Sequence, residues 1–151
     1  MTLTNLFKIL PLKNLNLLKN ELNDNQIEPI SKTLHTNPNI QQIYMSHNKM
    51  SKFGLNLLAN GLLTNTRLTD FFFTHNNLSE HQDTGIQFLK TFENKKDLKS
   101  LAFNSCSLNN DLLEELKNSI IDHTKLKELY LFANKIDHEG AVHISAIIRN
   151  K

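Results

Sequence analysis

Apolar and polar positions follow two different periods along this chain. In five stretches of eleven residues, apolar side chains occupy the first, fourth, sixth and eleventh positions, and Asn or Cys occupies the ninth. The stretches read LKNLNLLKNEL, IQQIYMSHNKM, LTDFFFTHNNL, LKSLAFNSCSL and LKELYLFANKI. Alternation around the fourth to sixth positions is typical of a strand that buries one face. Each stretch therefore predicts a short β-strand followed by a turn.

The segments between these stretches have the period of a helix. Their apolar residues recur at i, i+3 and i+7, which places one apolar stripe along a helix. The stripes are Ile27, Ile30 and Leu34; Leu55, Leu58 and Leu62; Gly85, Phe88 and Phe92; Leu113, Leu116 and Ile120; and Ala141, Ile144 and Ile148. Capping-box spacing from Ser79 to Gln82 and from Asp111 to Glu114 predicts two of the helix starts.

Strand and helix together form a unit that repeats along the chain. The five units start at residues 12, 40, 68, 98 and 126, so the period is 28 residues except for one unit of 30. One unit cannot bury its apolar face alone, so the units must stack, which lines up their strands as a parallel sheet. The predicted fold class is α/β, in a single domain over residues 1–151. Residues 1–11 are expected to be an N-terminal half-repeat that caps the fold, because Leu6 stands where Leu34 and Leu62 stand before the next units.

The repeated pattern also resembles a known family. All five stretches fit L-x-x-L-x-L-x-x-N/C-x-L, and Gly54 and Gly140 occupy the same place in the second and fifth units. With the 28-residue period, this is similar to the ribonuclease-inhibitor-like leucine-rich repeats over residues 12–151. The resemblance implies a curved solenoid, or horseshoe, with a parallel β-sheet on the concave face and helices on the convex face. It also implies that the concave face binds another protein, without implying which one.

Three consecutive phenylalanines indicate which side chains would face a partner. Because neighbouring side chains of a strand point to opposite faces, Phe71 and Phe73 are predicted to be buried and Phe72 to project from the concave face. Two columns of the stretches share this outward direction: Asn16, Tyr44, Phe72, Ala102 and Tyr130 at the fifth position, and Leu18, Ser46, Thr74, Asn104 and Phe132 at the seventh. The four aromatic members form an expected protein-binding strip. Packing across strands is the alternative reason for their aromatic character.

Two histidines adjoin this strip. His47 and His75 share the eighth position of adjacent strands and are expected about 4.8 Å apart. They could share a metal ion, but Asp70 is the only carboxylate expected nearby, and a zinc site requires three or four ligands. We therefore predict polar contacts at the rim of the binding face and no metal. Solvated side chains are expected for the remaining histidines, His35, His81, His123, His138 and His143.

The ninth position is predicted to be structural. An amide side chain both donates and accepts, so it can satisfy backbone groups where the chain leaves a strand. This predicted ladder contains Asn20, Asn48, Asn76, Cys106 and Asn134. A nucleophilic role for Cys106 is disfavoured, because the sequence shows no base or positive charge placed to activate it. No phosphate-binding loop or catalytic triad appears elsewhere, so we expect no enzyme activity and no cofactor.

Composition excludes several other classes. With 39% hydrophobic and 21% charged residues, the 151-residue chain can bury one core and is not of the disordered class. A net charge of +2 does not indicate binding to nucleic acid or to a membrane surface. The single cysteine excludes an internal disulfide and suits a reducing compartment. Without a signal peptide or a membrane-spanning run, the expected location is cytoplasmic.

The most favoured function is a protein–protein interaction module that binds its partner along the concave face. The alternatives are a structural scaffold subunit of a larger assembly, such as a ciliary or cytoskeletal one, a secreted bacterial effector that acts on host proteins, or a GTPase-regulating repeat protein. The final stretch AIIRNK lacks the polar cap that end units normally need. Ile144, Ile147 and Ile148 are therefore expected at an open edge that further units or a partner would cover.

Overall fold

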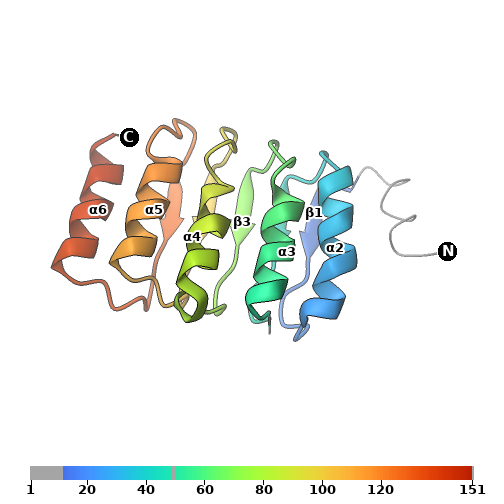
Figure 1. The fold of residues 1–151 in the computed structure, drawn as a ribbon. Coiled ribbons are helices and arrows are strands. Elements are labelled where there is room, and N and C mark those ends of the chain that lie inside the picture. Colours follow the sequence, from blue (N-terminus) through green and yellow to red (C-terminus); the bar gives the residue numbers. More distant parts are fainter. Residues whose placement is uncertain (1–11, 49, 151) are drawn as a thin grey trace.

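Short strands and helices alternate through the computed structural model, which describes residues 12–48 and 50–150 (Figure 1). The strands are β1 (Asn14–Asn16), β2 (Gln42–Tyr44), β3 (Asp70–Phe72), β4 (Ser100–Ala102) and β5 (Glu128–Tyr130). The helices are α2 (Asp24–Thr36), α3 (Lys52–Leu62), α4 (Gln82–Lys90), α5 (Asn110–Ile120) and α6 (His138–Arg149), with the 3-10 helix η1 (Ser79–His81) before α4. The predicted cap over residues 1–11 lies outside the described residues.

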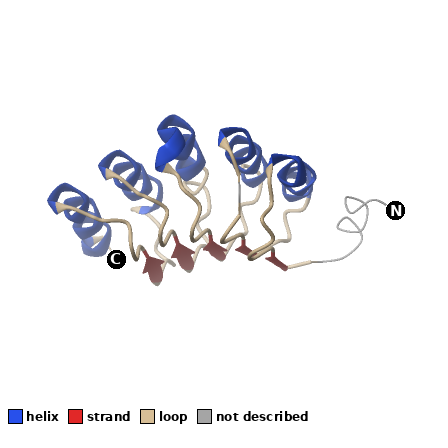
Figure 2. Ribbon diagram, turned by 90° about the horizontal axis from the view of Figure 1, so that it is seen from below, coloured by secondary structure: helices blue, strands red, loops and turns tan. Residues whose placement is uncertain are grey.

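The five strands form one parallel sheet in the order of the sequence. The register is the same at every step, because Leu15 pairs with Ile43, Ile43 with Phe71, Phe71 with Leu101, and Leu101 with Leu129. Helices α2 to α6 all lie on one side of this sheet (Figure 2). The predicted α/β class with a parallel sheet is thus confirmed. We call the side of the sheet that faces away from the helices the open sheet face.

The core lies between the sheet and the helix layer, and phenylalanines fill its centre. Phe71 and Phe73 are buried, as the alternation along β3 predicts. Removing such rings from water favours the packing of the two layers, because each ring buries a large apolar surface. The rings of this cluster meet with centroids 4.9 to 6.4 Å apart, and its members are Phe71, Phe73, Phe88, Phe92 and Phe103.

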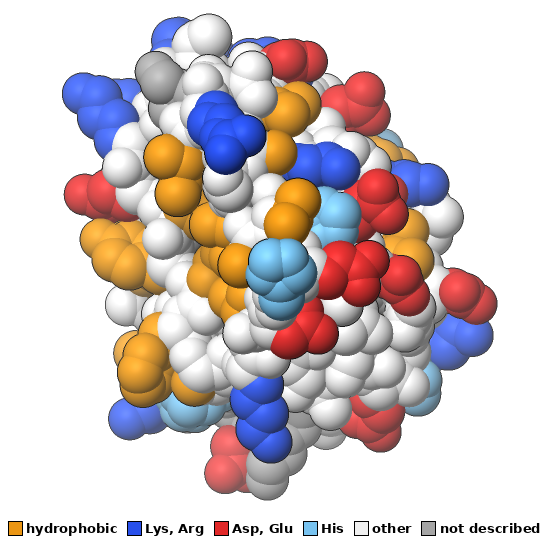
Figure 3. Space-filling model, turned by 90° about the vertical axis from the view of Figure 1, so that its left-hand side faces the viewer, with side chains coloured by type: hydrophobic (Ala, Val, Ile, Leu, Met, Phe, Trp, Pro, Cys, Tyr) orange, Lys and Arg blue, Asp and Glu red, His pale blue; other side chains and the backbone are white. Residues whose placement is uncertain are grey.

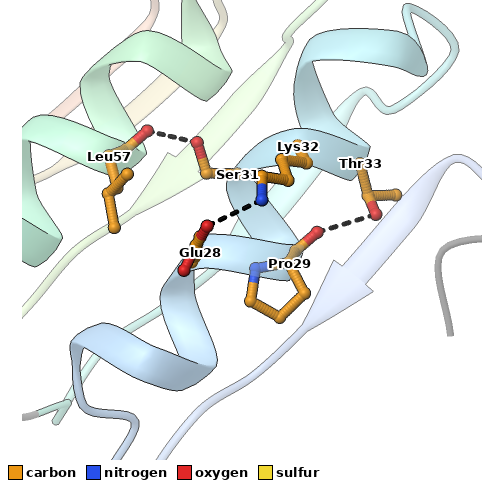
Figure 4. Close-up of polar contacts among 6 residues, drawn as sticks. All are labelled: Glu28, Pro29, Ser31, Lys32, Thr33 and Leu57. Atoms are coloured by element: carbon orange, nitrogen blue, oxygen red, sulfur yellow. Dashed lines mark hydrogen bonds and ion pairs between the residues drawn. The ribbon is translucent and has the colours of Figure 1, made fainter.

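Helices α2 and α3 approach closely enough for a side chain of one to bond the backbone of the other (Figure 4). The Ser31 hydroxyl of α2 donates a hydrogen bond to the carbonyl oxygen of Leu57 in α3. A Cβ atom at Gly61 would lie only 2.7 Å from the Ser31 carbonyl oxygen, so the contact requires glycine there. Inside α2, Thr33 Oγ1 donates to the Pro29 carbonyl oxygen at 2.9 Å.

Polar side chains at the ends of the preceding loops determine where most helices begin. These N-cap side chains each accept a backbone N–H of the first turn, which has no partner inside the helix. Helix α2 has a complete capping box, since the Asn23 N–H also donates to Gln26 Oε1 at 3.0 Å. The side chains that cap α2, α3, α5 and α6 are Asn23, Ser51, Asn109 and Asp137.

Both predicted capping boxes are wrong. Helix α5 is capped by Asn109 and not by Asp111. Asparagine is as effective an N-cap residue as aspartate, and Asn109 stands two residues before Asp111. Asp111 instead lies in the first turn of α5, where a negative charge is favourable. Ser79 begins η1, in the unit that is two residues longer, and its N–H donates to the Asn77 side chain at 3.1 Å. No side chain caps α4, whose N-cap residue is His81.

The predicted apolar stripe of α6 is also partly wrong. Ala141 is exposed and Ile148 is 67% exposed, whereas Ile147 is buried. In α3, the residue that corresponds to Ile148 is Leu62, which is fully buried. Helix α4 follows α3 and covers that side, but within the described residues no helix follows α6. Only the side of α6 that faces α5 is therefore covered.

Membrane insertion of a helix finds no support in the fold. Across residues 12–48 and 50–150, none of the helices combines the length and the apolar character that a bilayer crossing needs.

Candidate protein-binding site on the open sheet face

Tyr44 and Phe72 stand side by side on the open sheet face. They are register partners on β2 and β3, and their rings stack with centroids 4.9 Å apart and planes 8° from parallel. The side chains of Ile43 and Phe71, one residue earlier, point into the core. The strand alternation that buries one residue therefore places its neighbour on the open face.

A third ring continues this row on β5. The Phe72 and Tyr130 rings have centroids 6.4 Å apart, although β4 lies between their strands. Ala102 of β4 occupies the position between them and is only 1% exposed. A small side chain there allows the two rings to approach over it. Ala102 was expected to project from this face, and the flanking rings explain why it does not reach solvent.

Phe132 extends the row at the edge of the sheet. It follows Tyr130 by two residues and is 78% exposed, whereas Tyr130 is 44% exposed. The backbone N–H of Phe132 donates to Asn104 Oδ1 at 2.7 Å, which fixes the chain at this point. We call Tyr44, Phe72, Tyr130 and Phe132 together the aromatic strip.

Not all outward positions are available for contact. Ser46 is buried, because its Oγ accepts the N–H of Thr74 at 3.0 Å and thereby joins two neighbouring units. Leu18 at the opposite edge is 44% exposed, and its N–H donates to Asn16 Oδ1 at 3.1 Å. Alternation predicts which way a side chain points, and the neighbouring strand decides how much of it remains in contact with water.

His47 and His75 lie beside the aromatic strip, where the chain leaves β2 and β3. Their rings stack with centroids 4.0 Å apart, and both side chains are exposed. Both residues have φ near 58°, in the left-handed region. Partial burial lowers the pKa of His47, and the nearby charges of His75 and Lys19 lower it further. Both effects favour the neutral form of the His47 imidazole.

The opposite border of the strip is also polar. Asp70 accepts hydrogen bonds from Gln42 Nε2 at 2.9 Å and from Thr69 Oγ1 at 2.6 Å. Within the described residues, no group of three or more His, Cys, Asp or Glu side chains could hold a metal ion. The strip is therefore an apolar surface between two polar borders.

The predicted ladder residues Asn48, Asn76 and Asn134 connect the units beneath this face. Asn76 Oδ1 accepts the N–H of Asn48 at 3.2 Å, and its Nδ2 donates to the Phe73 carbonyl oxygen at 3.0 Å. Asn134 Oδ1 accepts the N–H groups of Cys106 and Leu108 at 3.0 and 3.2 Å. These side chains satisfy buried backbone groups that the short strands leave without partners.

The two other members of the predicted ladder differ from these three. Asn20 is exposed on the first unit, and its Nδ2 donates to the Leu18 carbonyl oxygen of its own loop at 3.2 Å. Cys106 is buried, and its thiol donates to the Phe73 carbonyl oxygen at 3.2 Å. Burial raises the pKa of Cys106 to about 12, so the reactive thiolate does not form at neutral pH.

Sequence reasoning missed a second buried polar row, beyond the C-terminal ends of the helices. It contains Asn37, Asn65, Lys95 and His123, one from each of the first four units. His123 was expected in solvent, but it is fully buried, with Nε2 2.9 Å from the Phe92 carbonyl oxygen. Asn37 and Asn65, 28 residues apart, are the signal that could have revealed the row. In the third and fourth units this position holds lysine and histidine, so asparagine does not recur there.

Lys95 is the most unusual member of this row. Its ammonium group is fully buried and donates to the carbonyl oxygens of Leu62 at 2.9 Å and Thr91 at 2.5 Å, and to Asn94 Oδ1 at 3.2 Å. The carbonyls belong to the ends of α3 and α4, where a positive charge is favourable. Burial nevertheless lowers the pKa of Lys95 to about 8. Lys95 thus joins two units from within the protein and is not accessible to a substrate.

Comparison with known proteins assigns no family. No protein-family model matches the chain, and no curated protein matches it significantly. The resemblance to leucine-rich repeats therefore stays a prediction.

Proposed function

We propose that this chain is a leucine-rich repeat solenoid of the ribonuclease-inhibitor-like kind, whose open sheet face is concave and binds a partner protein. Five strands in parallel order and constant register support this proposal, as do the five helices on the opposite side. The single buried cysteine is compatible with a reducing, cytoplasmic location.

The exposed aromatic strip is the observation that carries the binding proposal. Aromatic side chains with polar neighbours are typical of the residues that contribute most to protein–protein binding. Stacking accounts for part of the strip, since Tyr44 and Phe72 cover one another. It does not account for Tyr130 and Phe132, which remain 44% and 78% exposed. The exposed parts of these two rings can fill pockets on a partner.

The backbone beneath the strip is held by the sheet and by side-chain hydrogen bonds, which favours tight binding. Phe72 and Tyr130 are fixed by β3 and β5 and by the Ala102 contact between them. The backbone at Phe132 is fixed by the Asn104 side chain. A surface that is already ordered loses little conformational entropy when a partner binds. No catalytic role is proposed, and the buried Cys106 and Lys95 offer no accessible nucleophile.

The proposal can be tested by partner capture. The chain is immobilised and used to capture proteins from its native source, and the captured partner is then titrated against variants. Phe72→Ala and Tyr130→Ala are each expected to weaken binding by about 2 kcal/mol or more. Phe53→Ala is the matched control, because Phe53 is also an exposed phenylalanine, at 60%, but lies on α3 in the helix layer. Folded strip variants that bind as well as wild type, or a loss of binding in Phe53→Ala alone, would place the site elsewhere.

A further inference from the structure

The border of the aromatic strip beyond the strand ends carries basic side chains. Lys19, His47 and His75 share the eighth position of the first three units, and all three are exposed. Their N–H groups donate to carbonyl oxygens of the next unit, at 3.0 Å from Lys19 and at 2.9 Å from each histidine. These hydrogen bonds fix the spacing of the three residues, which we call the basic row.

The members of the basic row repel one another when they are charged. The rings of His47 and His75 stack with centroids 4.0 Å apart. Desolvation lowers the pKa of His47, and the charges of His75 and Lys19 lower it further. The chain by itself therefore opposes full protonation of the row. A negative charge placed against the row has the opposite effect, because it favours the protonated imidazole.

Other charged side chains of the molecule lie close to charges of the opposite sign. On α2, Lys32 pairs with Glu28 at 2.6 Å, and Lys125 pairs with Asp97 at 2.5 Å. Acidic and basic side chains are also intermixed on the end of the molecule beside α6 (Figure 3). Across residues 12–48 and 50–150, no carboxylate forms an ion pair with a member of the basic row. The row is therefore a surface of one charge sign at the border of an apolar strip.

The elements around the two histidines do not neutralise this border. Beside β1, Glu21 follows Lys19 by two residues, but the charges that act on His47 are those of Lys19 and His75. On β3, Asp70 lies at the opposite border of the strip and accepts hydrogen bonds there. After β4, the eighth position is the uncharged Ser105.

We propose that the partner of the open sheet face is acidic, so that it places apolar side chains on the aromatic strip and Asp or Glu carboxylates against the basic row. The inference rests on the proposed function and names the kind of partner. Complementary charges at the border of an apolar contact steer the partner and fix its orientation. A protonated imidazole donates from both ring nitrogens, so a carboxylate is a suitable acceptor for it.

Such a complex should bind more tightly at lower pH. The partner's carboxylates raise the pKa of His47 above its value in the free chain. Affinity therefore rises as the pH falls through the higher pKa and levels off below the lower one. The rise is at most about tenfold per pH unit for each proton taken up.

Peptide selection on the immobilised chain tests the inference directly. A library of random peptides is selected at about pH 6, where histidine is largely protonated. The selected peptides are expected to contain more Asp and Glu than the library does. One such peptide without histidine is then synthesised and titrated against the wild-type chain. Its affinity is expected to fall at least about threefold between about pH 6 and pH 8.

A double variant without the two imidazoles shows whether the row causes this dependence. His47→Gln with His75→Gln is expected to bind the peptide about tenfold more weakly at about pH 6 and to lose the pH dependence. The matched control is His35→Gln with His138→Gln, which removes two exposed histidines from α2 and α6 and is expected to bind as wild type does. Thermal melts confirm that every variant is folded.

Phe72→Ala separates this inference from the proposed function. Peptides that lose affinity in Phe72→Ala but show neither an acidic excess nor a pH dependence would overturn the acidic partner and leave the open sheet face as the binding site. A pH dependence that persists without His47 and His75 would also overturn it. A selection that yields no peptide dependent on Phe72 would overturn both proposals.

Discussion

Phe71 and Phe72 are neighbours in β3 and carry the same side chain, yet they lie in opposite environments. Phe71 is fully buried among four other phenylalanines, and Phe72 stacks on Tyr44 at the surface. Position along the strand, and not residue type, therefore decides whether a ring packs in the core or lies on the open sheet face.

Alanine substitution should separate these two roles. Phe71→Ala removes a ring from the packed core and is expected to lower the free energy of unfolding by about 3 to 5 kcal/mol. Phe72→Ala loses a surface stacking contact and is expected to cost about 1 kcal/mol. Urea denaturation followed by circular dichroism gives both values. A Phe72→Ala chain as unstable as Phe71→Ala would show that Phe72 belongs to the core.

Lys95 should make stability depend on pH in an unusual direction. Its pKa is about 8 in the folded chain and about 10.5 when unfolded. Between these values the unfolded chain binds more protons, so stability rises with pH, by at most about 1.4 kcal/mol per pH unit. Cys106 acts in the opposite direction above about pH 9, because its pKa is raised on folding.

A variant without the ammonium group isolates the contribution of Lys95. Lys95→Met keeps Cys106, so the difference in unfolding free energy between wild type and Lys95→Met cancels the thiol. That difference is expected to grow in favour of wild type from pH 8 to pH 10. A difference that stays constant over this range would mean that Lys95 keeps its ordinary pKa inside the fold.

At the scale of the elements, the three-residue strands depend on side chains to extend their hydrogen bonding. Asn48, Asn76 and Asn134 bond backbone groups beyond the strand ends, and Ser46 and Asn104 accept N–H groups from the adjacent unit. These contacts connect consecutive units more than they stabilise any unit by itself. Loss of one should therefore weaken the connection between two units.

Leucine substitution along the ladder tests this view. Asn76→Leu leaves the N–H of Asn48 without its side-chain acceptor and removes one of two side-chain donors from the carbonyl oxygens of Met45 and Phe73. It is expected to cost about 1 to 3 kcal/mol. Asn20→Leu at the exposed end is expected to change the unfolding free energy by less than about 0.5 kcal/mol. Equal costs at both positions, measured by urea denaturation at low protein concentration, would contradict this assignment.

The period of the sequence predicted the elements that depend on side-chain direction alone. All five strands and the burial of Phe71 and Phe73 follow from it. It did not predict features that depend on side chains of the adjacent units. Two such features are the covering of Ala102 by the rings of Phe72 and Tyr130 and the exposure of Ile148 on the side of α6 that faces away from α5. The buried row was also missed, because Lys95 and His123 replace asparagine and are polar residues usually found in solvent.

On the scale of the whole molecule, the two layers divide structural and proposed binding roles. The helix layer and the inner side of the sheet enclose the core (Figure 2). The aromatic strip crosses the open sheet face from β2 to the residues after β5.

Hydroxyl-radical footprinting of the chain, alone and in complex with its captured partner, tests the central claim most directly. The rate of oxidation reports how accessible each aromatic side chain is to solvent. Complex formation is expected to protect Tyr130 and Phe132 on the open sheet face and to leave Phe53 on α3 as reactive as before. Protection of Phe53 with Tyr130 and Phe132 still fully reactive would contradict the account and place the partner on the helix layer.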